Sequence, residues 1–266
     1  MEMELDPRLV SGPASTEVTR SPIGKDDSGP VADVTAAPWR FICLLEYKMG
    51  WTKWIPYGTG WLAAPDKVVT AAHCLEYPDD HPQKRQRIPR IRITPGRDVE
   101  SCPFKSQEST QFVSGWDGLS GADRDPRLDF AVLHLREPWR NLEGHFELAS
   151  IDKPEDLIGQ RVNVSGYPGA SRQQYFHEDA VVGFANGMLH YRTDTEEGQS
   201  GSPVFLYHPS APGRGRVQVV GLHTRSADWH TPEPGQFNSG PLLARETAER
   251  IARWIATGPG PKGMWA

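Results

Sequence analysis

Short apolar runs separated by glycine- and proline-containing turns dominate the chain. Residues 90–93 alternate with a period of two, so Ile91 and Ile93 are expected to face inward from a half-buried strand. Further runs have the length and the β-branched or aromatic content of strands, at 40–47, 57–63, 67–70, 130–135, 161–165, 187–192, 203–206 and 217–223. This pattern predicts an all-β protein.

One segment near the C-terminus has the period of a helix instead. Residues 245–256 place Ala248, Ile251, Ala252 and Ile255 on one face, with charged residues on the other, and Gly258-Pro259 follows. Many strands followed by a single helix predict two β-barrels, at about 37–145 and 155–242, with a C-terminal α-helix.

The ends of the chain differ in composition from the middle. Residues 1–36 contain much Pro, Gly, Ser, Asp and Thr and almost no large apolar side chain, so they cannot bury enough surface to offset the entropy lost on ordering. We therefore predict a flexible N-terminal tail over 1–36, which is a pro-segment, a linker or a plain disordered end. The predicted barrels then occupy 37–150 and 151–257, the second including the helix, and 258–266 form a C-terminal tail.

Composition and charge exclude some classes of partner. The net charge is −5, which gives no general attraction to nucleic acid or to anionic membranes. No apolar run approaches the ~20 residues that span a bilayer. The segment from Met1 to Asp6 is acidic and lacks the regions of a signal peptide. As written, the chain is expected to be cytoplasmic, or secreted if an export signal has been removed.

The three cysteines are Cys43, Cys74 and Cys102, an odd number that describes no disulfide framework. We expect three free thiols. No CxxC pair and no HExxH sequence is present, so neither a metal nor a cofactor is expected.

Three polar residues have the order and the contexts of a catalytic triad. His73 follows the strand 67–70, Asp129 precedes the strand 130–135, and Ser200 lies between two glycines. A serine hydroxyl needs a neutral imidazole to take its proton, and a buried carboxylate keeps that imidazole in the right tautomer. His, Asp, Ser is one of the chain orders known for such triads. The three residues therefore predict acyl transfer to Ser200 followed by hydrolysis.

Glycines beside Ser200 suggest how the reaction intermediate is stabilised. A tight turn can aim the main-chain N–H groups of Gly198 and Ser200 at one point, where the negative oxygen of a tetrahedral intermediate would lie. Gly198 and Ser200 are thus the predicted oxyanion hole.

These motifs resemble the chymotrypsin-like serine peptidase superfamily. Within it, the chain is most similar to V8-type glutamyl endopeptidases over residues 38–257, on the motifs Thr70-Ala71-Ala72-His73-Cys74, Ser165-Gly166-Tyr167-Pro168-Gly169, Thr193-Asp194-Thr195, Gly198-Gln199-Ser200-Gly201-Ser202-Pro203 and Val220-Gly221-Leu222-His223. The resemblance implies two six-stranded antiparallel β-barrels with the site in the cleft between them. Gly58 stands where the cysteine partner of Cys74 is usual, so that disulfide is not expected. Gln199 replaces the aspartate that pairs with a new N-terminus in animal trypsins.

Substrate preference depends on the residues around the predicted pocket. By resemblance, His223 and Thr195 bind an acidic side chain before the cut bond. An ungapped match to trypsin instead places Asp194 at the pocket base, which would favour Arg or Lys. Thr224, Arg225 and Ser226 are expected on the edge strand that pairs with the substrate backbone, where Ser226 could add a hydroxyl group to the pocket.

We therefore expect a serine endopeptidase that acts on protein or peptide substrates and prefers Glu or Asp. The alternatives are a protease that prefers Arg or Lys through Asp194, a regulatory protease held inactive until a partner or cleavage of the tail activates it, and a non-catalytic binding homologue.

Overall fold

A computed structural model describes residues 3–4, 28–79, 81–169, 171–211, 214–226 and 237–257. The strands are β1 (Met3–Glu4), β2 (Gly29–Pro30), β3 (Ile42–Met49), β4 (Lys53–Ala64), β5 (Lys67–Thr70), β6 (Ile91–Pro95), β7 (Gln107–Ser109), β8 (Gln111–Ser114), β9 (Ala131–His134), β10 (Glu147–Leu148), β11 (Arg161–Gly166), β12 (Tyr175–Ala185), β13 (Met188–Tyr191), β14 (Pro203–Ala211), β15 (Arg214–Leu222) and β16 (Asn238–Pro241). The α-helix is α1 (Arg245–Thr257), and 3₁₀ turns cover Trp39–Phe41, His73–Leu75, Gly121–Asp123, Pro126–Leu128 and Pro154–Leu157.

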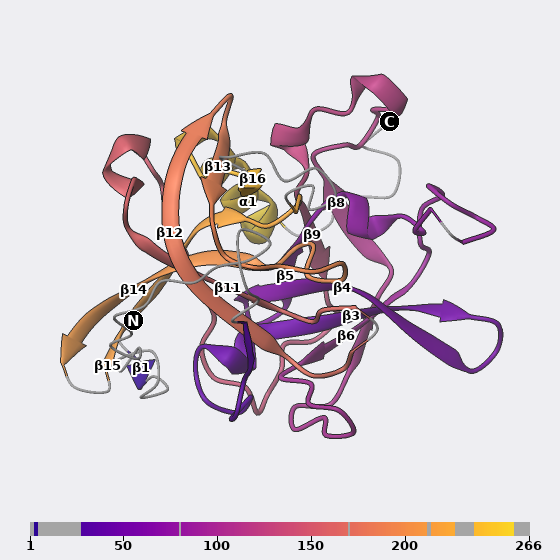
Figure 1. Cartoon of the computed structure of the whole chain (residues 1–266). Coiled ribbons are helices and arrows are strands. Elements are labelled where there is room, and N and C mark those ends of the chain that lie inside the picture. The colour runs from indigo at the N-terminus through magenta and orange to yellow at the C-terminus, as the bar shows by residue number, and fades with distance from the viewer. Residues whose placement is uncertain are drawn as a thin grey trace.

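The strands form two sheets that follow one another along the chain (Figure 1). The first has seven strands in the order β7-β6-β3-β4-β5-β9-β8, and the second has nine, with β1-β15-β14-β11-β12-β13-β16 as its main path. The expected all-β fold with one C-terminal helix is confirmed. The first sheet has one strand more than expected, and the second exceeds six because the two-residue strands β1, β2 and β10 add to it.

Aromatic side chains fill the contact between the sheets. The Phe146 ring lies 5.2 Å from that of Phe205 on β14 and 5.8 Å from that of Trp61 on β4. All three side chains are fully buried. Because these rings are shared by both sheets, the two halves are held in a fixed relation, which the site between them requires.

The helix α1 packs against the first sheet although it follows the second. Ala248 and Ile251 are buried, and the Trp254 ring lies 5.5 Å from that of Phe130, next to β9. In Figure 1 the helix lies near the junction of the indigo-to-magenta and orange strands. Of the predicted apolar face, Ala248, Ile251 and Ile255 pack against the core, whereas Ala252 is exposed and Trp254 packs although it was not part of that face.

The folded part of the chain begins earlier than predicted, so the predicted N-terminal tail was drawn too long. Residues 28–36 belong to the folded part: β2 pairs with β12, and the side chains of Val31 and Val34 are buried. Nearer the N-terminus, β1 pairs with β15. The rest of the predicted tail, 1–2 and 5–27, and the predicted C-terminal tail, 258–266, lie outside the described residues.

Among the described residues, no helix is long and apolar enough to cross a membrane. The same residues contain no group of three or more His, Cys, Asp and Glu side chains placed to hold a metal ion. All three cysteines are free thiols, as expected.

Candidate active site

His73 and Asp129 meet because their strands pair. The ladder between β5 and β9 places Thr70 opposite Ala131, so the residues beyond these two strand ends come together. His73 Nδ1 lies 2.8 Å from Asp129 Oδ2, and the His73 main-chain N–H donates to Oδ1 at 3.0 Å. A buried carboxylate in this position accepts from Nδ1–H, which leaves Nε2 of His73 free to accept a proton.

Opposing effects act on the protonation of His73. Burial opposes the charged form and is the largest single contribution, but the negative charge of Asp129, the neighbouring Cys74 and hydrogen bonds to both together raise the pKa of His73 well above its usual value. The imidazolium that forms during proton transfer is thus stabilised by Asp129.

Ser200 lies in a turn whose backbone conformation requires glycine at positions 198 and 201. Gly198 has φ +94° and Gly201 has φ +88°, in the left-handed region. A Cβ on Gly201 would lie 2.1 Å from the Thr59 carbonyl oxygen, and one on Gly198 would lie 2.6 Å from that of Tyr167. The flanking glycines let the turn pack tightly against β4.

The turn also leaves two main-chain donors unused. Gln199 N donates to Glu196 O at 3.1 Å, and Gly201 N donates to His223 O at 2.8 Å. In the described part of the chain, the N–H groups of Gly198 and Ser200 donate to no other protein group. These are the two donors expected for an oxyanion hole.

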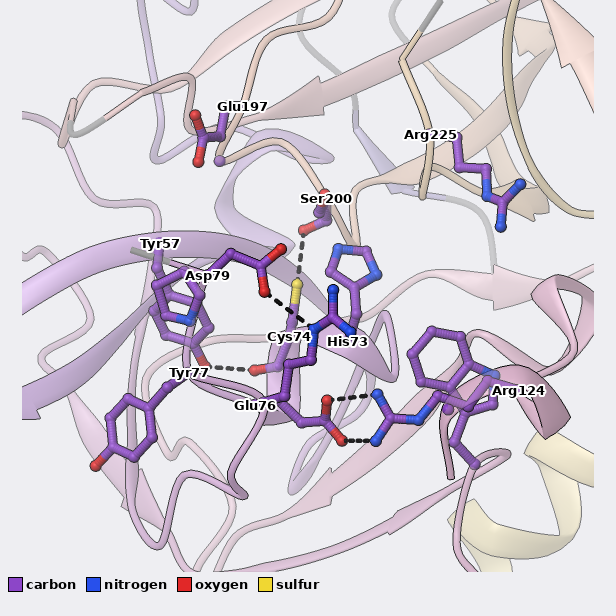
Figure 2. Close-up of a pocket in the computed structure, with 15 residues that line it drawn as sticks. Tyr57, His73, Cys74, Glu76, Tyr77, Asp79, Arg124, Glu197, Ser200 and Arg225 are labelled. Carbon is purple, nitrogen blue, oxygen red and sulfur yellow. Dashed lines mark hydrogen bonds and ion pairs between the residues drawn. The ribbon is translucent and has the colours of Figure 1, made fainter. Parts of the chain in front are cut away.

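His73 and Ser200 face the same cleft, of about 650 Å³ (Figure 2). Its remaining lining comes from Tyr57, Cys74, Glu76, Tyr77, Pro78, Asp79, Arg85, Trp116, Gly121, Arg124, Glu197, Gly198 and Arg225. Within the described residues, the Ser200 hydroxyl forms no hydrogen bond with the His73 ring. Such catalytic bonds are often long in free enzymes and tighten when substrate binds.

His223 is buried close to His73 and to the turn that carries Ser200. Its Nδ1 lies 2.7 Å from the hydroxyl of Tyr191, and its main-chain N–H donates to Ser202 O at 2.9 Å. Burial, and after it the charge of His73, lowers the pKa of His223 to about 3, so its ring is neutral in the free protein. Burial also raises the pKa of Tyr191 well above its usual value, so this hydroxyl keeps its proton.

Thr195 and Ser226 lie in contact with each other. Their hydroxyl oxygens lie 3.1 Å apart, and Asn238 Nδ2 donates to Thr195 Oγ1 at 2.8 Å. Asn238 also donates to the Thr193 carbonyl. These contacts fix the segment 193–195 against the segment 224–226, the two expected walls of the pocket.

Asp194 lies apart from the described cleft. Its main-chain N–H donates to Nδ1 of His177 on β12, and its carboxylate lies 3.5 Å from the same nitrogen. The Asp194 side chain is buried and that of His177 is nearly so. Neither residue is part of the lining of the cleft that contains Ser200, and the same holds for His223, Thr195 and Ser226. The sequence did not indicate His177 as the neighbour of Asp194.

Three residues that the structure brings to the site are not indicated by the sequence: Thr59, Tyr191 and Asn238. They contribute through contacts with residues distant in the chain, for which a single sequence carries no signal. Arg225 lies in the predicted edge segment 224–226, and the structure adds that it lines the cleft.

Comparisons with known proteins agree with this geometry. The family model described as a trypsin-like peptidase domain matches residues 58–208. The glutamyl endopeptidase of Bacillus licheniformis is 29% identical over 239 residues, which cover 88% of this chain and 69% of that protein. The extracellular metalloprotease of Bacillus subtilis is 27% identical over 237 residues, which cover 87% and 69%.

Among solved structures, a Glu endopeptidase in complex with MPD matches with a TM-score of 0.68 at 23% identity. The match covers 90% of this chain and all of that one. This likeness confirms the expected chymotrypsin-like fold.

Proposed function

The chain belongs to the trypsin-like peptidase family and is a serine endopeptidase, and from this premise we propose that His73, Asp129 and Ser200 are its catalytic residues and that it cleaves after Glu. The observation that carries the catalytic assignment is the hydrogen bond of 2.8 Å between His73 and Asp129 at the edge of the cleft that Ser200 lines.

The proposed reaction passes through an acyl-enzyme. Nε2 of His73 takes the proton of the Ser200 hydroxyl as its oxygen attacks the carbonyl carbon of the substrate. The carbonyl oxygen becomes negative and accepts hydrogen bonds from the N–H groups of Gly198 and Ser200. The tetrahedral intermediate collapses as the C–N bond breaks, and His73 gives its proton to the leaving amine. Water, deprotonated by His73, then attacks the ester and releases Ser200.

Preference for Glu is supported by the tautomer of His223. The hydroxyl proton of Tyr191 has no acceptor other than Nδ1 of His223 among the described residues. When Tyr191 donates to Nδ1, the proton of the neutral imidazole lies on Nε2, which can donate to a substrate carboxylate. The hydroxyl groups of Thr195 and Ser226, which lie 3.1 Å apart, would supply further donors in the proposed pocket.

The alternative preference for Arg or Lys has less support. It requires the Asp194 carboxylate to face the substrate, whereas this side chain is buried and packs against His177. Control by an activating partner stays a prediction.

A fluorophosphonate probe and a peptide series test the proposal. The parent protein should be labelled and should cleave peptides after Glu faster than after Gln or Lys. Ser200→Ala should abolish labelling, while Ser120→Ala, a serine that also precedes a glycine, should leave it intact. No label on the parent, or equal label on Ser200→Ala, contradicts the catalytic assignment.

The preference is tested separately with His223→Ala. Loss of a donor to a buried carboxylate costs ~2 kcal/mol, so cleavage after Glu should become about 30-fold slower. Cleavage after an uncharged residue should change little. Equal loss on both peptides, or no loss on either, contradicts the assignment of His223 to the pocket.

A further inference from the structure

Some of the charged side chains that line the cleft around Ser200 form ion pairs with one another, and others do not. Three arginines and three carboxylates line it: Arg85, Arg124, Arg225, Glu76, Asp79 and Glu197. Arg124 is fixed to Glu76 by two hydrogen bonds of 2.6 and 2.7 Å, and Arg85 donates to Asp79 at 3.0 Å. In the part of the chain that the structure describes, Arg225 and Glu197 form no ion pair.

The main-chain hydrogen bonds of Arg225 show which edge of the segment 224–226 is available to a substrate. Arg225 N donates to Ser239 O at 3.0 Å and Ser239 N donates to Arg225 O at 2.9 Å, so both polar groups of its main chain face β16. The Thr224 N–H also donates to Ser239 O, at 3.2 Å, whereas the Thr224 carbonyl and both main-chain groups of Ser226 form no hydrogen bond within the described residues, as expected for groups that alternate in direction. That free edge is where an extended substrate can pair with the protein.

The register of such a pair places one substrate residue opposite Arg225. His223 bonds to the main chain of Gly201 and Ser202, so Thr224 is the edge residue nearest to the nucleophile. A substrate strand that runs antiparallel along this edge puts the residue of the attacked carbonyl opposite Thr224, and the preceding residue opposite Arg225. Side chains directly opposite each other in an antiparallel pair lie on the same face, ~5 Å apart at Cβ.

The surroundings of Arg225 favour a negative side chain at that position. Across the cleft, the guanidinium of Arg124 stacks over the ring of Trp116 at 5.2 Å, while its charge is already matched by Glu76. Figure 2 shows Arg225 extending alone on one side of Ser200 and Glu197 on the other. The unpaired carboxylate in the cleft is therefore not placed to satisfy Arg225.

We propose that Arg225 selects an acidic residue immediately before the residue at which the substrate is cut. The free guanidinium forms two parallel hydrogen bonds with the substrate carboxylate, in the fork geometry that arginine offers. This inference rests on the proposed function, because the register is defined by attack of Ser200. It adds a second acid-selecting position, made by a different residue from those around His223.

Two peptides that differ only at this position test the inference. Both carry Glu at the cut bond, and one has Glu and the other Gln before it. At low salt the parent should show a kcat/KM about tenfold higher for the Glu peptide, and the ratio should shrink as salt rises. Arg225→Gln should bring the ratio close to one, and Arg225→Glu should favour a Lys peptide over the Glu peptide.

Arg90→Gln is the matched control. Arg90 is an exposed arginine that pairs with Glu108 away from the cleft, so its loss makes the same charge change without touching the site. It should keep the parent ratio. A parent ratio near one, or an unchanged ratio in Arg225→Gln, overturns the proposal.

Binding measurements on a variant without the Ser200 hydroxyl test this inference independently of the proposed function. Product peptides that end in Glu, with Glu or Gln before it, are titrated into Ser200→Ala and into Ser200→Ala with Arg225→Gln. The Glu product should bind about tenfold more tightly to the first protein, and the difference should vanish in the second. Should the parent cleave neither peptide, the catalytic proposal fails, and this pair of titrations still supports or overturns the role of Arg225.

Discussion

The main-chain N–H of Thr59 donates a 2.9 Å hydrogen bond to the carbonyl oxygen of Ser200, so a strand of the first sheet holds the turn that carries the proposed nucleophile. The Thr59 hydroxyl donates to the Gly198 carbonyl at 2.9 Å and accepts from the Tyr167 N–H at 3.0 Å. Thr70 in turn donates to the Thr59 carbonyl at 2.7 Å. The turn that carries Ser200 is thus held in place by residues of both sheets.

Replacing Thr59 tests this support. Thr59→Val keeps the shape but leaves the Gly198 carbonyl and the Tyr167 N–H without their buried partner, which should cost ~2 kcal/mol of unfolding free energy. We also expect kcat to fall about tenfold, because a loosened turn places the oxyanion donors less accurately. Thr59→Ser retains the hydroxyl and should recover most of both values. Denaturant unfolding and steady-state kinetics measure the two effects, and parent-like kcat in Thr59→Val would contradict the positioning role.

Asp129→Asn should lower kcat by roughly 10⁴, because the amide favours the wrong tautomer of His73.

Asp129→Asn should also change the pH dependence of kcat/KM. A general base works only when deprotonated, so kcat/KM of the parent should rise with pH through the raised pKa of His73, above its usual value of about 6.5. Without the Asp129 charge, the midpoint should move to lower pH. An unchanged midpoint in the residual activity would mean that Asp129 does not set the pKa of His73.

Tyr191→Phe tests the tautomer of His223. Without the hydroxyl, Nδ1 of His223 loses its hydrogen bond and the proton is no longer held on Nε2. The preference for Glu over Gln at the cut bond should fall about tenfold. The rate for the Gln peptide serves as the internal control, since a general defect would slow both peptides alike and leave the ratio unchanged.

A prediction of stability concerns His134, on β9. Its side chain is buried and, among the described residues, both ring nitrogens lack a hydrogen-bond partner. Burial, with a smaller contribution from the charge of Lys67, lowers its pKa to about 4. Between about pH 6.5 and 4 the unfolded chain binds a proton at this residue and the folded chain does not, so stability is lost as the pH falls.

His134→Leu should remove this loss. The variant should gain up to about 3 kcal/mol over the parent at pH 4, and less above pH 6.5. Denaturant titrations of both proteins at pH 4.5 and pH 8 measure the difference. The same gain at both pH values would show that titration of His134 is not the cause.

The apolar runs and the helical period of the sequence located several elements well. The expected strand 67–70 is β5, and the expected helix 245–256 is α1 with one residue added. The long strand β12 was not predicted, because most of its side chains are half-buried and give no clean alternation. The folded part of the predicted tail was missed for a related reason: Val31 and Val34 are isolated apolar residues in a polar segment, and only contacts with the rest of the chain bury them.

The sequence by itself determined the kind of chemistry. Histidine, aspartate and a glycine-flanked serine lie next to strands in a particular order, and a local pattern of residues is enough to express that. Tertiary structure decided which charges remain available. Arg124 is neutralised by Glu76, and Asp194 is buried against His177, while Arg225 lines the cleft and forms no ion pair with any other described residue. Ion pairing depends on distances between side chains far apart in the sequence, and only folding sets those distances.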